Sequence, residues 1–195
     1  MKVSELLTSV RNTLQDLDEN YWDDSELLSY YNECKRSMAA ERLEGKTTAT
    51  LTLDPLKNEY DTSGILRYIY AEDDLDNDRA LYPNDRTGEG DAKGIIVLDY
   101  NRIYINDPSL GTTLTMQVIA LPAEDNLSSN VRFGDENAMK YYILSKSYEK
   151  DSDMENFQKS DVFYRKYLEM FKPLKDAANA NYTTNTVQIS EAIYY

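Results

Sequence analysis

The spacing of apolar residues changes twice along the chain, and this change constrains the fold more than any other feature of the sequence. Val3, Leu7 and Val10 recur every three or four residues, which predicts an apolar stripe on a helix. Over residues 47–121 the spacing falls to two, as in half-buried strands. Helical spacing returns after residue 134. The order of periods therefore predicts an α+β fold, with a β segment between two helical segments.

The N-terminal segment is expected to form a helical hairpin, with helices at about residues 3–18 and 24–44. Asp23 can accept hydrogen bonds from the free amides at the start of the second helix, and Glu26 stands three residues later, as in a capping box. Trp22 is the only tryptophan and lies between the helices. It can close the hairpin internally or project to a partner, because tryptophan is common in both settings.

Four apolar runs with strand-like alternation follow the hairpin, at residues 47–55, 64–71, 94–107 and 112–121. They predict four or five strands. No helical pattern separates the runs, so an antiparallel sheet or small sandwich is expected rather than parallel βαβ units.

A second helical hairpin is expected from helices at about residues 135–149 and 153–172. Pro173 is expected to kink or end the second of these helices, because proline lacks a backbone N–H. Residues 177–195 begin with small polar residues and end in VQISEAIYY, which predicts an extended C-terminal arm that can add a strand to a neighbour. The alternative is a disordered tail in the free subunit. We therefore expect a single domain over residues 1–176, followed by the arm.

Charge and residue types exclude several classes of function. The 195 residues carry 35 Asp and Glu against 21 Lys and Arg, a formal charge of −14, so the surface should repel nucleic-acid phosphates and anionic lipids. The absence of histidine excludes Ser-His and Cys-His nucleophile pairs and His-ligated zinc. Cys34 is the only cysteine, and its place on an apolar stripe favours a buried side chain over a reactive thiol. No apolar run is long enough to span a membrane, and no cofactor is expected.

An acidic segment at residues 71–85 is the strongest candidate for a metal site. Asp74, Asp76 and Asp78 have the one-three-five spacing of a calcium-binding loop. Arg79 stands where such a loop needs glycine, so a solvated acidic loop fits the pattern better and no metal site is expected. A calcium-binding module and a carboxylate-dependent hydrolase stay open as alternatives, since two acidic groups often lie close together in so acidic a chain.

Several motifs occur in a fixed order along the chain. Trp-x-Asp-x-Glu-Leu-Leu links the first two helices, and Tyr-x-Asn-Glu follows on the second. A strand, a proline-bearing turn and a strand ending in Leu-Pro occupy residues 98–122. With the aromatic helices of residues 136–171, this order resembles the head-to-tail adaptor (connector) proteins of tailed bacteriophages. The resemblance covers about 170 residues and departs at the acidic segment 56–93.

The resemblance implies a structural ring protein without catalysis, typically a dodecamer, beneath the portal at the capsid vertex. It implies that the helices form the ring body, that the β part faces tail or nozzle proteins, and that the C-terminal arm reaches the portal protein. DNA would pass through the ring without specific binding. The implied location is the neck of the virion after assembly in the host cytoplasm. The nearest alternative is another neck or tail-completion protein.

The resemblance also assigns coarse roles to individual residues. The residues that it implies in packing or subunit contact are Trp22, Tyr31, Tyr142 and Tyr164. The residues that it implies in portal contact are Tyr182, Val187, Ile189, Ile193, Tyr194 and Tyr195. The 17 tyrosines of the chain agree with such contacts, because an aromatic ring with a polar tip suits surfaces that become buried between subunits.

Overall fold

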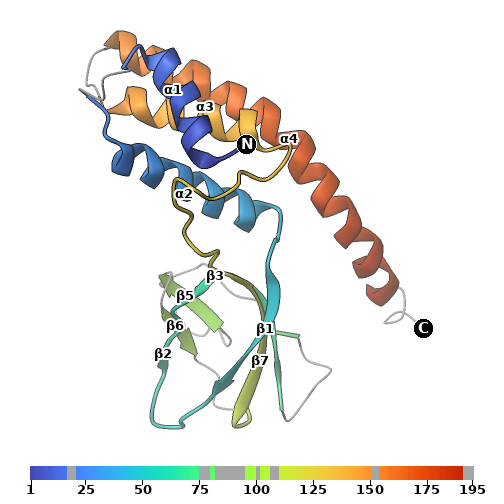
Figure 1. The fold of residues 1–195 in the computed structure, drawn as a ribbon. Coiled ribbons are helices and arrows are strands. Elements are labelled where there is room, and N and C mark those ends of the chain that lie inside the picture. The colour runs from blue at the N-terminus through green and yellow to red at the C-terminus, as the bar shows by residue number, and fades with distance from the viewer. Residues whose placement is uncertain are drawn as a thin grey trace. The chain divides into compact units, whose positions relative to one another are not determined.

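The computed structural model comprises two compact units: a helical unit of Met1–Arg42 and Ala123–Tyr195, and a β unit of Leu43–Pro122 (Figure 1). The structure describes residues 1–16, 21–74, 80–81, 95–99, 102–105, 110–150 and 154–190. Its elements are α1 (Val3–Leu14), α2 (Asp24–Glu41), β1 (Lys46–Thr52), β2 (Glu59–Asp61), β3 (Ile65–Asp73), β4 (Ala80–Leu81), β5 (Ile95–Asp99), β6 (Arg102–Ile105), β7 (Thr113–Ala120), α3 (Glu136–Glu149) and α4 (Met154–Ser190). The expected α+β class is confirmed. The β unit is inserted between α2 and α3 and has its own core, so the stretch expected as one domain contains two compact units.

The helical unit is held together by the apolar stripes that the spacing predicts. All four helices contribute side chains to one core. Its fully or nearly fully buried members include Val3, Leu6, Leu7, Val10, Leu27, Tyr31, Cys34, Met38, Met139, Ile143, Leu144, Tyr167 and Phe171. Asp23 begins α2 as expected, because its carboxylate accepts a hydrogen bond from the Glu26 backbone N–H at 2.8 Å. The Glu26 side chain, however, contacts Lys150 at 2.7 Å rather than returning to the backbone.

The first helix ends earlier than the expected residue 18. Gln15 has a φ of 60°, in the left-handed region, which interrupts the helical backbone. The Asp16 carboxylate then accepts a hydrogen bond from the Trp22 backbone N–H at 3.0 Å. The Trp22 indole N–H donates in turn to the Ser147 carbonyl at 3.2 Å. Ser147 lies in the last turn of α3, where carbonyls lack a helical partner, so Trp22 closes the hairpin and caps a second helix.

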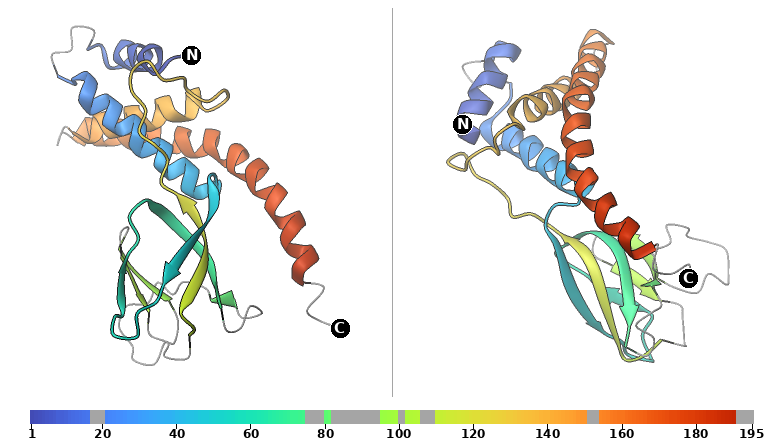
Figure 2. Two further views of the ribbon diagram at one scale, coloured as in Figure 1. Left: turned by 60° about the horizontal axis from the view of Figure 1, so that its bottom comes forward. Right: turned by 90° about the vertical axis from the view of Figure 1, so that its right-hand side faces the viewer.

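The β unit contains seven strands in two antiparallel sheets among the residues that the structure describes (Figure 2). One sheet has the order β1-β7-β3-β4 and the other the order β2-β6-β5. Both sheets contribute to one core, which contains Ala71, Ile103, Ile105, Leu114, Met116 and Val118. The expected antiparallel pairing is therefore confirmed, and the shared core gives the unit the character of a small sandwich.

The run over residues 94–107, one of the four runs from which we expected four or five strands, contains the two strands of a hairpin. Asp99 pairs with Arg102, so β5 and β6 are joined by only two residues. Tyr100 and Asn101, which connect the two strands, lie outside the described residues. Alternation predicts both strands but not the reversal between them.

The last helix differs most from expectation. α4 continues through Pro173 to Ser190, so the expected end at residue 172 is wrong, and residues 177–190 are helical rather than extended. A proline removes only one helical hydrogen bond, and three alanines between residues 177 and 180 favour the helix. The C-terminal part of α4 extends past the other helices of its unit (Figure 1). Residues 191–195 lie outside the described residues.

Candidate functional site

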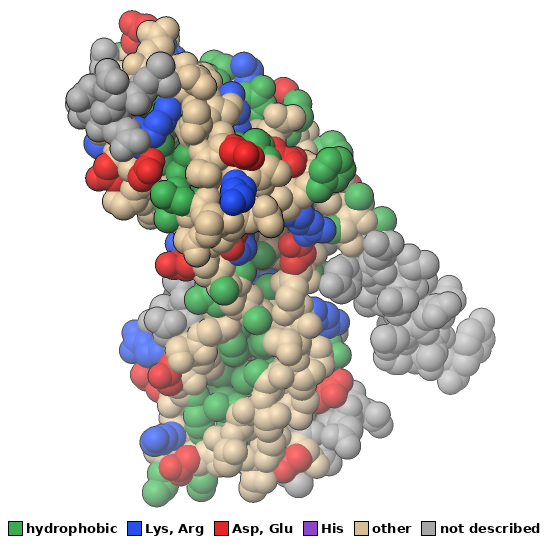
Figure 3. Space-filling view, viewed as in Figure 1, with side chains coloured by type: hydrophobic (Ala, Val, Ile, Leu, Met, Phe, Trp, Pro, Cys, Tyr) green, Lys and Arg blue, Asp and Glu red, His purple; other side chains and the backbone are tan. Residues whose placement is uncertain are grey.

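α4 exposes a row of apolar side chains beside the face that it buries. Met154, Phe157, Tyr164 and Leu168 are spaced by three, seven and four residues, so they lie along one side of the helix; we call this row the α4 stripe. Phe157 is 66% exposed and Leu168 is 45% exposed. Hydrophobic side chains at the surface of the helical unit are visible in Figure 3. The exposed Asp161 lies between Phe157 and Tyr164 on the same side of the helix, so the row is an apolar surface with one charged interruption. Exposed apolar side chains gathered on one face are typical of a protein-binding site.

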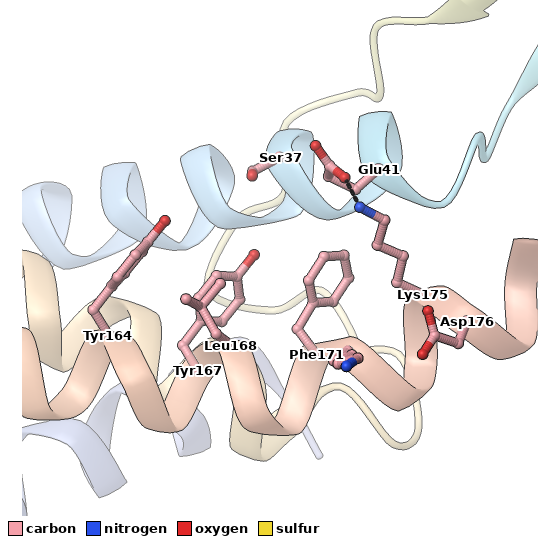
Figure 4. A pocket seen from close by; sticks show the side chains of 9 residues that line it. Ser37, Glu41, Tyr164, Tyr167, Leu168, Phe171, Lys175 and Asp176 are labelled. Atoms are coloured by element: carbon pink, nitrogen blue, oxygen red, sulfur yellow. Dashed lines mark hydrogen bonds and ion pairs between the residues drawn. The ribbon is translucent and has the colours of Figure 1, made fainter.

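The α4 stripe runs into a groove between α2 and α4, which we call the α2/α4 groove (Figure 4). The groove has a volume of about 460 Å³. Its lining comprises Ser37, Glu41, Tyr164, Tyr167, Leu168, Phe171, Lys172, Lys175 and Asp176. The rings of Tyr167 and Phe171 stack with their centroids 5.5 Å apart and their planes inclined by 5°. These rings form an aromatic floor that is itself at least 96% buried, while the exposed apolar side chains of the groove are Tyr164 and Leu168, which also belong to the stripe.

Charged groups border the aromatic floor. The Lys175 ammonium forms an ion pair with the Glu41 carboxylate, which joins α4 to α2 at this end of the groove (Figure 4). Lys172 is exposed beside them. Burial raises the pKa of the Tyr167 hydroxyl, so the floor stays uncharged at neutral pH. An apolar floor with a charged border suits the binding of an apolar side chain from a protein partner.

A buried ion pair supports the floor of the groove from the other side. The Arg42 guanidinium donates to both carboxylate oxygens of Asp135, at 2.8 and 2.7 Å, and both side chains are about 95% buried. The Arg42 guanidinium also stacks on the Phe171 ring, 5.3 Å from its centroid. A bidentate pair of this kind fixes orientation, so it holds α2, the start of α3 and α4 in register.

The four residues predicted in packing or subunit contact fall into two groups. Trp22, Tyr31 and Tyr142 are at least 90% buried and lie in the helical core. Tyr164 is 43% exposed and lies on the α4 stripe at the groove. Within a single chain, the first three therefore pack internally, while Tyr164 has the exposure that a subunit contact requires.

Two of the buried tyrosines bind acidic groups. The Tyr31 hydroxyl donates to Asp125 at 3.0 Å, and the Tyr142 hydroxyl donates to Glu33 at 2.7 Å. Burial, followed by the nearby carboxylates, raises the pKa of both hydroxyls above the ordinary value. These tyrosines thus stay neutral and act as hydrogen-bond donors within the core.

The residues predicted in portal contact lie at the end of the chain. Tyr182, Val187 and Ile189 are on the C-terminal part of α4, but their side chains lie outside what the structure describes. Ile193, Tyr194 and Tyr195 lie outside the described residues altogether. Their role stays a prediction.

The acidic segment gives no metal site in the part that the structure describes. Asp74 accepts a hydrogen bond from the Thr112 hydroxyl at 2.8 Å, whereas Asp76, Asp78 and Arg79 lie outside the described residues. No group of three metal-ligating side chains occurs among the residues searched, which are the described ones. In the same residues, no helix has the length and apolar content needed to cross a membrane.

The sequence analysis missed the α2/α4 groove and the Arg42–Asp135 pair. A signal for the α4 stripe was present, because Met154 and Phe157 continue the spacing of Tyr164 and Leu168. The groove and the ion pair join residues roughly 90 to 140 positions apart, and helical spacing carries no information about such pairs.

Comparison with known proteins places the β unit and nearly all of the helical unit in one family. The family model described as SU10 adaptor protein matches residues 1–188. This range includes both helical hairpins, all strands of the β unit and nearly all of α4. No curated protein sequence matches the chain.

Proposed function

The chain belongs to the SU10 adaptor protein family, a family of phage structural adaptors, and we propose that it forms a ring that joins the capsid portal to the tail. The helical unit would form the body of the ring, around the path of the DNA. The role is structural, and no catalytic step is part of it. The resemblance to head-to-tail adaptors that the order of motifs implied is confirmed at the level of the family.

The α4 stripe and its groove are the observation that carries the proposal. Among the described residues, a single chain leaves the four large apolar side chains of the stripe exposed along one side of α4, beside a groove with an aromatic floor. Covering such a surface with a second copy would bury apolar area, and each Å² buried contributes about 25 cal/mol of favourable free energy. In a closed ring each copy is held on two sides, so contacts of modest strength suffice for assembly.

The charge of the chain supports a ring around DNA. The formal charge of −14 is repeated in every copy, and dodecameric adaptors of this kind would carry it twelve times. Negative walls repel phosphates and so provide a path without holding the DNA. The charge also disfavours a role in binding nucleic acid or anionic lipid.

The C-terminal part of the chain is proposed as the portal contact. Residues 177–190 continue α4 past the other helices of the unit. Helix formation alone hardly offsets the entropy that it costs, so most helices depend on packing for their stability. A partner that packs on this segment would stabilise it, and the portal protein is the partner that we propose for residues 177–195. The β unit would contact tail or nozzle proteins.

Reconstitution with the cognate portal protein tests this function. The full chain and a version ending at Asp176 are each mixed with the portal, and the complexes are examined by native mass measurement and electron microscopy. We expect the full chain to add a ring to the portal, and the shortened chain to bind at least about tenfold more weakly. A chain that stays monomeric with and without the portal would contradict the proposal and direct the search to other neck or tail-completion partners.

A further inference from the structure

Phe133 is the most exposed aromatic side chain among those that the structure describes in the helical unit, with 96% of its surface accessible. The loop that carries it is nevertheless firmly held. On one side, the buried Val131 donates its backbone N–H to the Met1 carbonyl at 3.0 Å. On the other side, Asp135 is fixed by Arg42. The loop therefore presents an apolar ring to solvent in a defined position.

Local geometry keeps the Phe133 side chain outside. Gly134 has a φ of +92°, which a residue with a side chain rarely adopts, and it turns the chain between Phe133 and α3. The Glu136 carboxylate accepts a hydrogen bond from the Gly134 N–H at 2.8 Å. A side chain that is 96% exposed makes no contribution to its own core, and an aromatic side chain with only two rotatable bonds on a held backbone loses little entropy when it binds.

The α2/α4 groove is complementary to this ring in shape and chemistry. Its volume of about 460 Å³ lies in the range of cavities that hold small ligands, so it has room for an aromatic ring and its neighbours. The stacked Tyr167 and Phe171 rings are at least 96% buried and form a firm base beneath the groove. Tyr164 and Leu168 add apolar walls.

Charge does not select the partner of the groove. Its border carries groups of both signs, since Lys172 and Lys175 stand beside Glu41 and Asp176, and Lys175 forms an ion pair with Glu41. Docking on this surface therefore depends on the apolar side chains.

We propose that Phe133 of one copy inserts into the α2/α4 groove of a second copy. The inference rests on the proposed ring and names the contact that builds it. Because the inserted side chain and the groove are different surfaces of the same unit, the contact is heterologous and repeats from copy to copy. Such a contact produces a closed ring when the rotation between copies closes, whereas a two-fold dimer needs one self-complementary patch.

Arg42 connects the two surfaces within each copy. Its guanidinium binds Asp135, two residues after Phe133, and stacks on Phe171 in the floor of the groove. The position of the inserted ring relative to the groove is therefore set by one buried side chain. In a ring, this relative position determines the rotation from one copy to the next.

Cysteine cross-linking tests the contact, because the chain has a single cysteine, Cys34, and it is fully buried. We would combine Phe133→Cys with Leu168→Cys, and separately with Tyr164→Cys, and oxidise the assembled protein. Since both partners are exposed, the variants should fold. At least one of the two double-cysteine variants should give a ladder of covalent multimers, because each copy then links to two neighbours. The matched control combines Leu56→Cys, which is 93% exposed on the β unit, with Leu168→Cys, and should give no ladder.

Measurement of mass tests the ring, and cross-linking tests the Phe133 contact, so the two proposals can fail separately. If the unmodified chain forms rings with the portal but neither Phe133 pair gives a ladder beyond the control, the Phe133 contact is refuted and the ring stands. If the chain stays monomeric with the portal, the ring itself is refuted. In addition, Phe133→Ala should weaken self-association at least about tenfold without changing the folded monomer, as for a buried aromatic anchor.

Discussion

Removal of the Arg42 guanidinium should destabilise the helical unit more than removal of any exposed charge. In Arg42→Met, the buried Asp135 carboxylate loses two hydrogen bonds of 2.8 and 2.7 Å and its counter-charge. An uncompensated charge at such a buried position costs about 3–5 kcal/mol. Loss of the stacking on Phe171 adds about 0.5–1 kcal/mol. We therefore expect the free energy of unfolding to fall by about 3–6 kcal/mol, a large part of the stability of an ordinary domain.

Urea denaturation followed by tryptophan fluorescence measures this loss, because Trp22 is the only tryptophan and is buried in the same unit. The matched control is Arg36→Met. Arg36 lies 3.2 Å from Glu124, whose side chain is 75% exposed, so its loss should cost about 0–1 kcal/mol. A cost for Arg42→Met no larger than that of the control would refute the reasoning. Arg42→Met combined with Asp135→Leu should recover most of the loss, since no unpaired charge is then buried.

Three further predictions concern the helical core. Burial and Glu26 raise the pKa of Tyr30 to about 12, and burial raises the pKa of Tyr142. Because the unfolded chain ionises these hydroxyls near pH 10, the free energy of unfolding should fall from about pH 10 to about pH 12. Constant stability in urea titrations across this pH window would contradict the prediction. Cys34 is buried, and burial raises the pKa of its thiol. An aromatic disulfide reagent should therefore react with the chain only after denaturant is added. Rapid reaction with the native protein would show that the thiol is accessible. Trp22→Phe removes the donor to the Ser147 carbonyl and should cost about 1–2 kcal/mol by circular dichroism in urea; an unchanged midpoint would refute the capping role.

Local features of the fold could be predicted from the sequence because they depend on neighbouring residues. The stripe of α1 and the cap at Asp23 follow from spacing and residue type, and both are present. The end of α1 could not be predicted, because it depends on Gln15 adopting a left-handed backbone while Asp16 binds the Trp22 N–H. The hairpin at Asp99 was missed because two strands of the same period meet at a two-residue turn.

The candidate site could be predicted only in part. The resemblance to head-to-tail adaptors implies Tyr164 in packing or subunit contact, but its neighbour in the groove, Glu41, comes from a helix more than 100 residues away. Phe133 was not singled out, because nothing in the spacing shows that a loop leaves its ring exposed. Its significance follows from the tertiary contacts of Asp135, which fix the loop.

The central claim is that the α4 stripe is covered by a second copy in a ring, and paired substitutions on one helix test it most directly. Leu168 and Met170 are 45% and 44% exposed, but two residues apart they point to different sides of α4, and only Leu168 lies on the stripe. Mixed with the cognate portal, Met170→Asp should assemble within about twofold of the unmodified chain, while Leu168→Asp should assemble at least about tenfold less in native mass measurements. Equal assembly of the two variants would contradict the claim.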